Sequence, residues 1–307
     1  MGRHRRLLGS AALVLLLLSG GAHGQTSIED ALKTLSGDNG IGYMQPLADL
    51  FSANMNAGLY HSAAISRFGF HIEFDLIVMG SLVGDDRQSY TATTPPRFNP
   101  PVFTTATVFG GQGSTVQNTN APGISYRGPD GVFNTSMFPL FIPQLTVGNV
   151  LGTQAMVRFL TLPKFGSGSI PEGTLWSVGA RHSISQWIPS LPLDVAASFS
   201  YGNLSVDWSE GGGQLIDYSG YTFGVQASKK FSALIVYGGL ALDNSTMGIS
   251  YQSTDPNLPG AISFDLKGAN KFRATAGLCL SLGVFKLFAD VNLGAVTHFS
   301  GGIGFGG

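Results

Sequence analysis

The sequence has few charged residues, one cysteine and no long apolar run beyond its N-terminal region. Charged side chains make up 11% of the 307 residues, whereas a soluble protein carries about 25%. The lone Cys279 excludes an internal disulfide framework. No stretch after residue 24 has the roughly 18 consecutive apolar residues of a membrane helix. A soluble domain would therefore have an unusually uncharged surface, and a helical membrane protein would lack its spans.

The first residues have the layout of a cleaved secretory signal, and we assign residues 1–24 to a signal peptide. Three arginines precede an apolar run at 7–18, which ends in small residues. Cleavage is expected near Gly24/Gln25. Removing three arginines and no acid changes the formal charge from -1 to -4. This mild acidity argues against nucleic acid as a partner.

Strict alternation marks the segment 67–83, RFGFHIEFDLIVMGSLV. One face carries Phe68, Phe70, Ile72, Phe74, Leu76 and Val78, and the other carries His71, Glu73 and Asp75 followed by Ile77 and Met79. A period of two residues predicts a β-strand, and its length suits a tilted crossing of a bilayer. A half-buried strand of a soluble sandwich would alternate in the same way.

Similar alternating segments follow at regular spacing from residue 140 onward. They predict strands at 142–150, 153–162, 174–185, 193–207, 214–228, 231–252, 272–281, 285–293 and 299–307, with Lys229-Lys230 in a turn and a loop at 253–260. In every strand that contains a charge, the charge lies opposite the aliphatic and aromatic series. A membrane barrel must keep charges off its lipid face, because Arg or Lys at mid-bilayer costs about 2–4 kcal/mol. The pattern favours an all-β fold, an antiparallel transmembrane β-barrel of about 10–14 strands.

Two short amphipathic helices are predicted in an N-terminal helical segment, 25–63. Thr26 and Glu29 form a capping box before the first helix. Pro46 suits the first turn of the second helix, which Gly58 would end. The shared face of this second helix makes Leu47, Leu50 and Phe51 the candidates for contacts inside a barrel. The segment is a plug in the mouth of the barrel, a pair of helices that lies in the periplasm against its rim, or a frayed leader with no plugging role.

The barrel is expected to occupy 64–307. Residues 84–137 are rich in Gly, Pro, Asn and Thr, and an irregular segment of this length is unusual in a compact soluble domain. It is typical of a long extracellular loop. A hairpin hidden in it would raise the strand number from ten to twelve.

Polar side chains on the inward face are the candidate functional residues. We predict a lumen lined by His71, Glu73, Asp75, Arg158, Arg181, Asp194, Gln226, Arg273, Lys286 and Asp290. Neighbouring members of the first three lie about 7 Å apart along one strand, so a metal site would need ligands from other strands. We expect the two acids to pair with arginine or lysine across the lumen, with no metal and no cofactor. Cys279 is expected to be a small inward packing residue.

A His182-Ser183 pair invites comparison with barrel hydrolases. Neighbouring residues of a strand point to opposite faces, so these side chains cannot form a hydrogen-bonded catalytic pair. No catalytic residue is assigned, and the protein is expected not to be an enzyme.

The layout resembles outer-membrane barrels of the FadL-like fatty-acid and hydrocarbon transport type, or uncharacterised barrel families near them. The resemblance is carried by the segments 43–47, 58–63, 181–186 and 301–305, which read YMQPL, GLYHSA, RHSISQ and GGIGF. The resemblance implies a signal peptide, helices before the first strand and a barrel with Gly-rich strands. The Asn-Pro-Ala plug signature of FadL-like transporters does not occur in this chain.

These observations predict a bacterial outer-membrane protein that acts as a passive or plug-gated conduit for small, in particular hydrophobic, molecules. Its expected partners are outer-membrane lipids, the outer-membrane assembly machinery and a hydrophobic small-molecule substrate. The alternative is a non-conducting surface barrel with a structural or adhesive role through its extracellular loops. A packed ten-stranded barrel would not conduct, whereas a conduit would.

Overall fold

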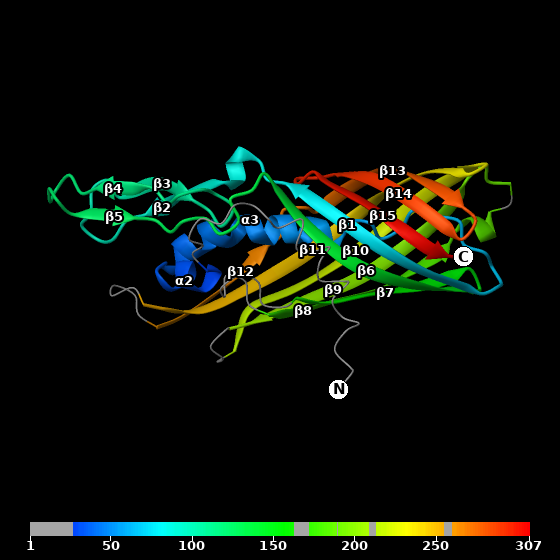
Figure 1. Ribbon diagram of the computed structural model, residues 1–307, viewed down its shortest axis with the longest axis horizontal. Coiled ribbons are helices and arrows are strands. Elements are labelled where there is room, and N and C mark those ends of the chain that lie inside the picture. Colours follow the sequence, from blue (N-terminus) through cyan, green and yellow to red (C-terminus); the bar gives the residue numbers. More distant parts are fainter. Residues whose placement is uncertain (1–26, 163–171, 189, 209–212, 255–259) are drawn as a thin grey trace, which may run out of the picture.

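The computed structural model describes residues 27–162, 172–188, 190–208, 213–254 and 260–307 (Figure 1). The predicted signal peptide and Thr26 lie outside the described residues.

Ten antiparallel strands form a closed barrel in this part of the chain, which confirms the predicted fold class. In chain order they are β1 (His71–Leu82), β6 (Met137–Val150), β7 (Thr153–Leu162), β8 (Gly173–Ser183), β9 (Asp194–Asp207), β10 (Gln214–Phe231), β11 (Leu234–Ser253), β13 (Phe272–Leu282), β14 (Phe285–Leu293) and β15 (His298–Gly306). Each strand pairs with its neighbour in this list, and β1 pairs with β15 to close the ring. Closure leaves the barrel without an open sheet edge.

The alternation in sequence becomes an alternation of exposure in the strands. On β1, Phe74 is 46% exposed while its neighbours Glu73 and Asp75 are 3% and 1% exposed. Phe68 and Phe70 precede the strand, which begins at His71, and both are exposed. The apolar faces therefore point outward and the charged faces point into the lumen, the reverse of a soluble barrel.

The two ends of the barrel differ in the length of their connections. At the short-turn end, two-residue turns at 151–152, 232–233 and 283–284 join three pairs of strands, and the longer connection 184–193 joins β8 to β9. The turn at 232–233 corrects a prediction, because Lys229 and Lys230 belong to β10 and lie opposite Val236 and Ile235 of β11. Both lysines are exposed at the strand end. A strand can carry exposed charge there because that end lies outside the band that must stay apolar.

Longer connections gather at the opposite, long-loop end. Segment 84–137, expected as an irregular loop, contains a short 3₁₀ turn η1 (Asp85–Arg87) and two hairpins, β2 (Ser89–Thr93) with β3 (Val102–Ala106) and β4 (Thr115–Gln117) with β5 (Ser125–Arg127). The hairpins project beyond the barrel (Figure 1) and do not join it. The ring therefore has ten strands, at the lower bound of the predicted range.

One strand was not expected from the sequence. β12 (Gly260–Lys267) pairs with 246–253 of β11, beyond the part of β11 that pairs with β13. Ile262 and Phe264 of β12 pack against the buried core inside the barrel. A second 3₁₀ turn, η2 (Ser185–Trp187), follows β8 at the short-turn end.

Both predicted helices exist, with different starts. α2 (Ile28–Lys33) is capped by the Ser27 side chain, which accepts a hydrogen bond from the Asp30 N–H at 2.9 Å. The predicted second helix begins nine residues earlier, because α3 (Gly37–Met55) starts behind Ser36. Pro46 lies inside α3 and not in its first turn, so it leaves the carbonyl of residue 42 without its usual helical donor.

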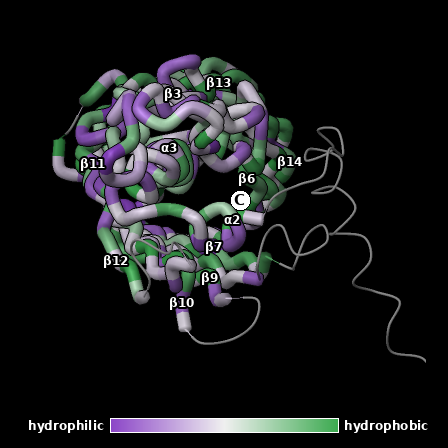
Figure 2. Tube along the Cα trace, turned by 90° about the vertical axis from the view of Figure 1, so that its left-hand side faces the viewer, coloured by the Kyte–Doolittle hydropathy of each residue, from purple (hydrophilic) through white to green (hydrophobic). Residues whose placement is uncertain are grey.

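The C-terminal part of α3 lies inside the ring of strands, whereas its N-terminal part packs against the projecting segment (Figure 1), where Asn39 Nδ2 donates to the carbonyl of Thr93 and the Tyr43 hydroxyl donates to that of Asp130. Figure 2 looks from the end that carries α2 and shows α3 enclosed by β6, β7, β11 and β13. The chain then continues through the lumen as the extended segment 56–70 and begins β1 at the short-turn end. No helix in the described residues is long and apolar enough to cross a membrane. We refer to residues 27–63 as the plug.

Candidate functional site

The plug meets an apolar lumen near the long-loop end. The predicted plug residues Leu47, Leu50 and Phe51 are 5%, 0% and 4% exposed. The Phe51 ring packs edge-on against Tyr218 of β10, with centroids 4.8 Å apart. Inward positions of the strands supply further apolar partners in the same core, among them Ile77, Met79, Ile142, Leu204, Met247 and Ile249. This half of the lumen is thus a packed core and not a polar pore.

Polar bonds fix α3 to the barrel within this core. The Ser81 hydroxyl donates to the Leu50 carbonyl at 3.1 Å and contacts Asn54 Oδ1 at 2.7 Å. Asn54 Nδ2 donates to the carbonyl of Phe138 at 2.8 Å. Asp49 accepts from Gln45 Nε2 at 2.8 Å, and burial raises the pKa of Asp49 against the opposing effect of that bond.

Arg158 holds the plug at mid-lumen. Its guanidinium donates to the carbonyls of Met55 at 3.1 Å, Ala57 at 2.9 Å and Gly58 at 2.8 Å, and its Nε donates to Gln144 Oε1 at 2.9 Å. Arg158 is completely buried. The segment after α3 has left the helix, so its carbonyls need donors, and this side chain supplies them.

Backbone geometry at Gly58 depends on the absence of a side chain. Its φ is +60°, and a Cβ there would lie 2.7 Å from Cγ2 of Ile77. The plug can pass this close to β1 because residue 58 is glycine.

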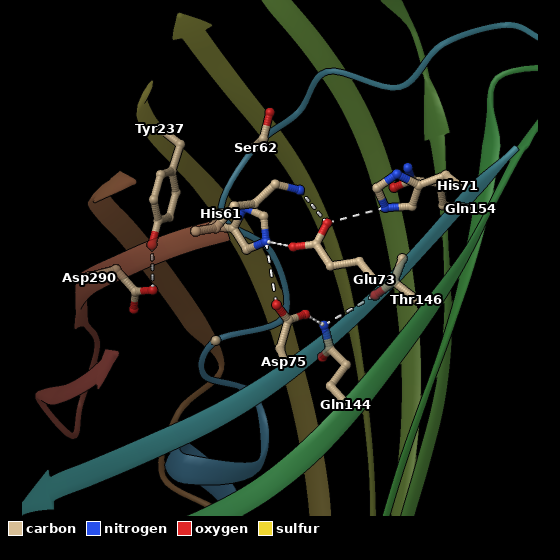
Figure 3. Close-up of polar contacts among 12 residues, drawn as sticks. His61, Ser62, His71, Glu73, Asp75, Gln144, Thr146, Gln154, Tyr237 and Asp290 are labelled. Atoms are coloured by element: carbon tan, nitrogen blue, oxygen red, sulfur yellow. Dashed lines mark hydrogen bonds and ion pairs between the residues drawn. The ribbon is translucent and has the colours of Figure 1, made fainter. Parts of the chain in front are cut away.

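Below Gly58 the plug enters a cluster of charged side chains, shown in Figure 3. His61 Nε2 lies 2.6 Å from Glu73 Oε1 and 3.8 Å from Asp75 Oδ1. The second oxygen of Glu73 accepts from Lys286 and lies 3.2 Å from His71 Nε2, a charge contact without hydrogen-bond geometry. Asp75 Oδ2 accepts from Gln144 Nε2 at 3.3 Å. A plug histidine thus faces two carboxylates of β1.

Arg181 and Ser228 hold the last part of the plug. Arg181 Nη1 donates to the Ser62 carbonyl at 2.8 Å, and its Nη2 donates to Gln154 Oε1. Ser228 Oγ accepts from the Ala63 N–H at 2.8 Å. A cavity of about 190 Å³ lies beside this segment, lined by His61, His71, Asp194, Arg181, Lys230 and Lys286 among others.

A second polar cluster lies on β11, β13, β14 and β15 and involves the predicted lumen residues Arg273 and Asp290. Arg273 Nε donates to Asp243 Oδ2 at 3.0 Å, and its Nη1 donates to Asn292 Oδ1 at 3.1 Å. Asp290 accepts from Tyr237 at 2.9 Å and from Ser300 at 2.6 Å. Gln226 is 1% exposed, and its amide has no hydrogen-bond partner among the described residues.

The predicted charge pairing is correct only for Glu73, which pairs with Lys286. Asp75 bonds to Gln144, Arg273 bonds to Asp243, and Arg158 and Arg181 bond to plug carbonyls. The difference arises because the plug fills the lumen and presents unpaired carbonyls, which the arginines satisfy.

Among the residues of these clusters that sequence reasoning missed are Asp243, Tyr237 and His61. Asp243 and Tyr237 share the inward parity of β11 opposite the exposed Leu240 and Leu242, so alternation could have found them. His61 precedes the first strand, where no periodicity marks it.

Cys279 is fully buried. His182 contacts Thr153 and Gln186, while Ser183 contacts Ser185 and the Gln186 N–H.

Comparison with protein families identifies one match, which covers residues 4–307. The chain belongs to DUF6588, a family of unknown function. Among curated proteins, none matches the sequence significantly.

Solved structures similar to this member of DUF6588 include three bacterial barrels. The outer membrane protease OmpT from Escherichia coli is 7% identical, with 80% of this chain and 98% of OmpT covered and a TM-score of 0.33. The translocator domain of autotransporter NalP from Neisseria meningitidis is 12% identical, with coverages of 83% and 91% and a TM-score of 0.30. A mutant porin of Rh. blastica is 11% identical, with coverages of 78% and 99% and a TM-score of 0.17. At these scores the fold assignment rests on the strand pairing of the chain itself, and the predicted FadL-like relationship is not confirmed.

Proposed function

We propose that this protein is an outer-membrane β-barrel whose plug closes the lumen at rest and gates the passage of small molecules. The observation that carries the proposal is the path of residues 56–63 through the lumen, where side chains of the barrel hold the plug by hydrogen bonds. Such bonds exchange readily with water once the plug moves, because each contributes only about 0.5–3 kcal/mol net.

The membrane location is supported by the outer surface. Large apolar side chains that are at least 39% exposed occur on every strand of the ring, including Phe74, Val78, Leu145, Val157, Phe159, Val178, Phe199, Phe223, Val225, Val236, Leu240, Leu242, Phe272, Leu278, Leu287, Phe299 and Ile303. A monomeric soluble protein rarely exposes a continuous apolar surface of this extent. We assign this surface to contact with outer-membrane lipids, reached through the outer-membrane assembly machinery.

The substrate class follows from the cavity and from the FadL-like layout. Arg181, Lys230 and Lys286 line the cavity beside the plug, and cations of this kind favour an acidic group. The layout favours a hydrophobic molecule. A small hydrophobic acid combines both properties, and the protein would move it without catalysing a reaction.

Conductance in planar bilayers tests the gating. Wild-type barrel, refolded and checked by heat-modifiable migration, should be mostly silent, whereas a barrel lacking residues 27–63 should conduct steadily. A silent plugless barrel that still shows heat-modifiable migration would exclude the conduit. Folding of the wild-type chain as a soluble monomer without detergent would exclude the membrane location as well.

A second candidate function is suggested by the projecting hairpins. β2–β3 and β4–β5 extend beyond the barrel and expose Val102 and Ile124, at 46% and 55%. A non-conducting surface barrel would use such hairpins for adhesion. Loss of cell adhesion after deletion of 89–127, with a plugless barrel that stays silent, would favour this function.

A further inference from the structure

The plug and the barrel together place three metal-ligating side chains at one point in the lumen. His61 Nε2, Glu73 Oε1 and Asp75 Oδ1 all lie within 4.8 Å of one another. We propose that these residues bind a divalent transition-metal ion of the Zn²⁺ class, which joins the plug to β1. The site does not require that the barrel conducts, although bound metal would hold the plug in place and so regulate the proposed gate.

The geometry is close to that of a bound ion. Bonds of 2.0–2.2 Å from a tetrahedral zinc separate the ligand atoms by about 3.3–3.5 Å. His61 Nε2 lies 2.6 Å from Glu73 Oε1 and 3.8 Å from Asp75 Oδ1. The ion would replace the proton between histidine and glutamate, and the ligands would need to shift by about 1 Å or less.

An unpartnered oxygen points into the same space. Asp75 is 1% exposed, and its Oδ1 has no hydrogen-bond partner among the described residues. A buried carboxylate oxygen without a partner is costly, and a cation would satisfy it. This observation is independent of the clustering of acids.

Gly304 of β15 leaves the room that the two carboxylates occupy. A Cβ at residue 304 would lie 2.5 Å from Asp75 Oδ1 and 3.0 Å from Glu73 Oε1. Any larger residue would push the ligand oxygens apart, so the barrel keeps both acids close to His61.

Nearby basic side chains do not occupy the ligand atoms. Lys286 bonds to Glu73 Oε2, and His71 contacts the same oxygen, which leaves Oε1 directed at His61. Gln144 donates to Asp75 Oδ2 and orients the carboxylate, as the outer partners of metal ligands commonly do.

The donor set selects the class of ion. One imidazole and two carboxylates suit Zn²⁺ and its neighbours in the first transition row. Ca²⁺ and Mg²⁺ prefer oxygen ligands alone, so the imidazole nitrogen of His61 favours a transition ion over either of them. Water from the adjacent cavity, which His61 and Glu73 also line, would complete the coordination of a transition ion.

Metal binding to the detergent-folded mature barrel tests the proposal. After EDTA treatment, titration calorimetry and elemental analysis with Zn²⁺ should give one ion per chain for the wild type. His61→Ala and Asp75→Asn should each weaken this binding by more than about 100-fold, beyond the effect of losing an outer partner. Co²⁺ should give a visible absorption band in the wild type that disappears in His61→Ala.

His182→Ala is the matched control, because His182 lies at the same end of the barrel and bonds to Thr153 and Gln186 away from the cluster. It should bind Zn²⁺ as the wild type does. Heat-modifiable migration verifies that each variant is folded, and His61→Ala carries the test if Asp75→Asn fails to fold. Equal Zn²⁺ affinity of wild type and His61→Ala, or no binding to the wild type, would overturn the proposal. If the plugless barrel does not conduct, the gated conduit is excluded, but the metal stoichiometry of the wild type is not affected. The proposed function and the metal site can therefore be disproved independently.

Discussion

Buried side chains of the barrel bond to the plug in the lumen, and Arg158 alone donates to three of its carbonyls. Replacing it by glutamine removes three hydrogen bonds to the carbonyls of 55, 57 and 58. A hydrogen bond to a charged group contributes about 1.5–3 kcal/mol, and the freed carbonyls would remain buried. Arg158→Gln should therefore make the plug sensitive to limited proteolysis while the barrel keeps its heat-modifiable migration.

Arg127→Gln serves as the control for Arg158→Gln, because Arg127 is half exposed in an ion pair with Asp130 on the projecting hairpins. Its plug should resist protease like that of the wild type. Equal resistance in Arg158→Gln would show that apolar packing of α3 alone holds the plug.

Gly58 offers a second prediction at the scale of one residue. Gly58→Ala forces a non-glycine residue to φ +60° and places a Cβ 2.7 Å from Ile77. Backbone strain and overpacking each cost about 1–3 kcal/mol. The plug of this variant should be more accessible to protease and the free energy of unfolding in detergent should fall.

Replacing Gly283 by alanine separates backbone strain from overpacking as causes of the lost stability. Its φ is +67°, and no atom lies within 4 Å of an added Cβ. Gly283→Ala should show only the cost of the backbone conformation. An identical loss in both variants would mean that the close approach of the plug to Ile77 contributes nothing.

At the scale of the strand, alternation predicted which face points outward but not what fills the lumen. Glu73 and Asp75 lie inward as their parity required, and so do Ile77 and Met79 of the same strand. A polar pore does not account for apolar residues on the inward face of the strand. They pack on α3, and this half of β1 therefore has apolar residues on both faces.

Strand ends and turns were less predictable for a related reason. The lysines at the end of β10 resemble a turn because charge is rare in the middle of a barrel strand. The sequence did not predict β12, because its apolar residues Ile262 and Phe264 contact the plug and not lipid. In both places the neighbouring residues in the sequence do not determine the structure. β12 depends on its contact with α3, and the end of β10 can carry lysines because it lies beyond the apolar band.

The outward face carries a prediction at the scale of the element. Val225 of β10 is 51% exposed, and Val225→Lys would place a charge in the lipid-facing band. This should reduce the stability of the barrel in bilayers by about 2–4 kcal/mol if residue 225 lies near the midplane. Urea unfolding in lipid vesicles measures the change.

Val102→Lys is the matched control, because Val102 is 46% exposed on a strand of the projecting hairpins. Its stability should stay within about 0.5 kcal/mol of the wild type. A tolerated lysine at 225 would contradict the assignment of this face to lipid.

At the scale of the whole molecule, the path of the chain has a consequence for orientation. Turns of outer-membrane barrels are short on the periplasmic side and long on the outer side. α2 lies at the long-loop end, where the carbonyl of Lys33 accepts from the N–H of Thr254, just after β11. We therefore expect the plug to run from the outer face inward and residues near Thr34 to lie at the cell surface.

Labelling of intact cells measures this orientation. In a Cys279→Ala background, a cysteine in place of the exposed Thr34 should react with a membrane-impermeant maleimide without permeabilisation. A cysteine in place of Val284, 54% exposed in the turn between β13 and β14, should react only after permeabilisation. The reverse pattern would place the long loops in the periplasm. If both cysteine variants react only after permeabilisation, α2 does not stay at the long-loop end in the cell. The plug would then approach the barrel from the periplasm.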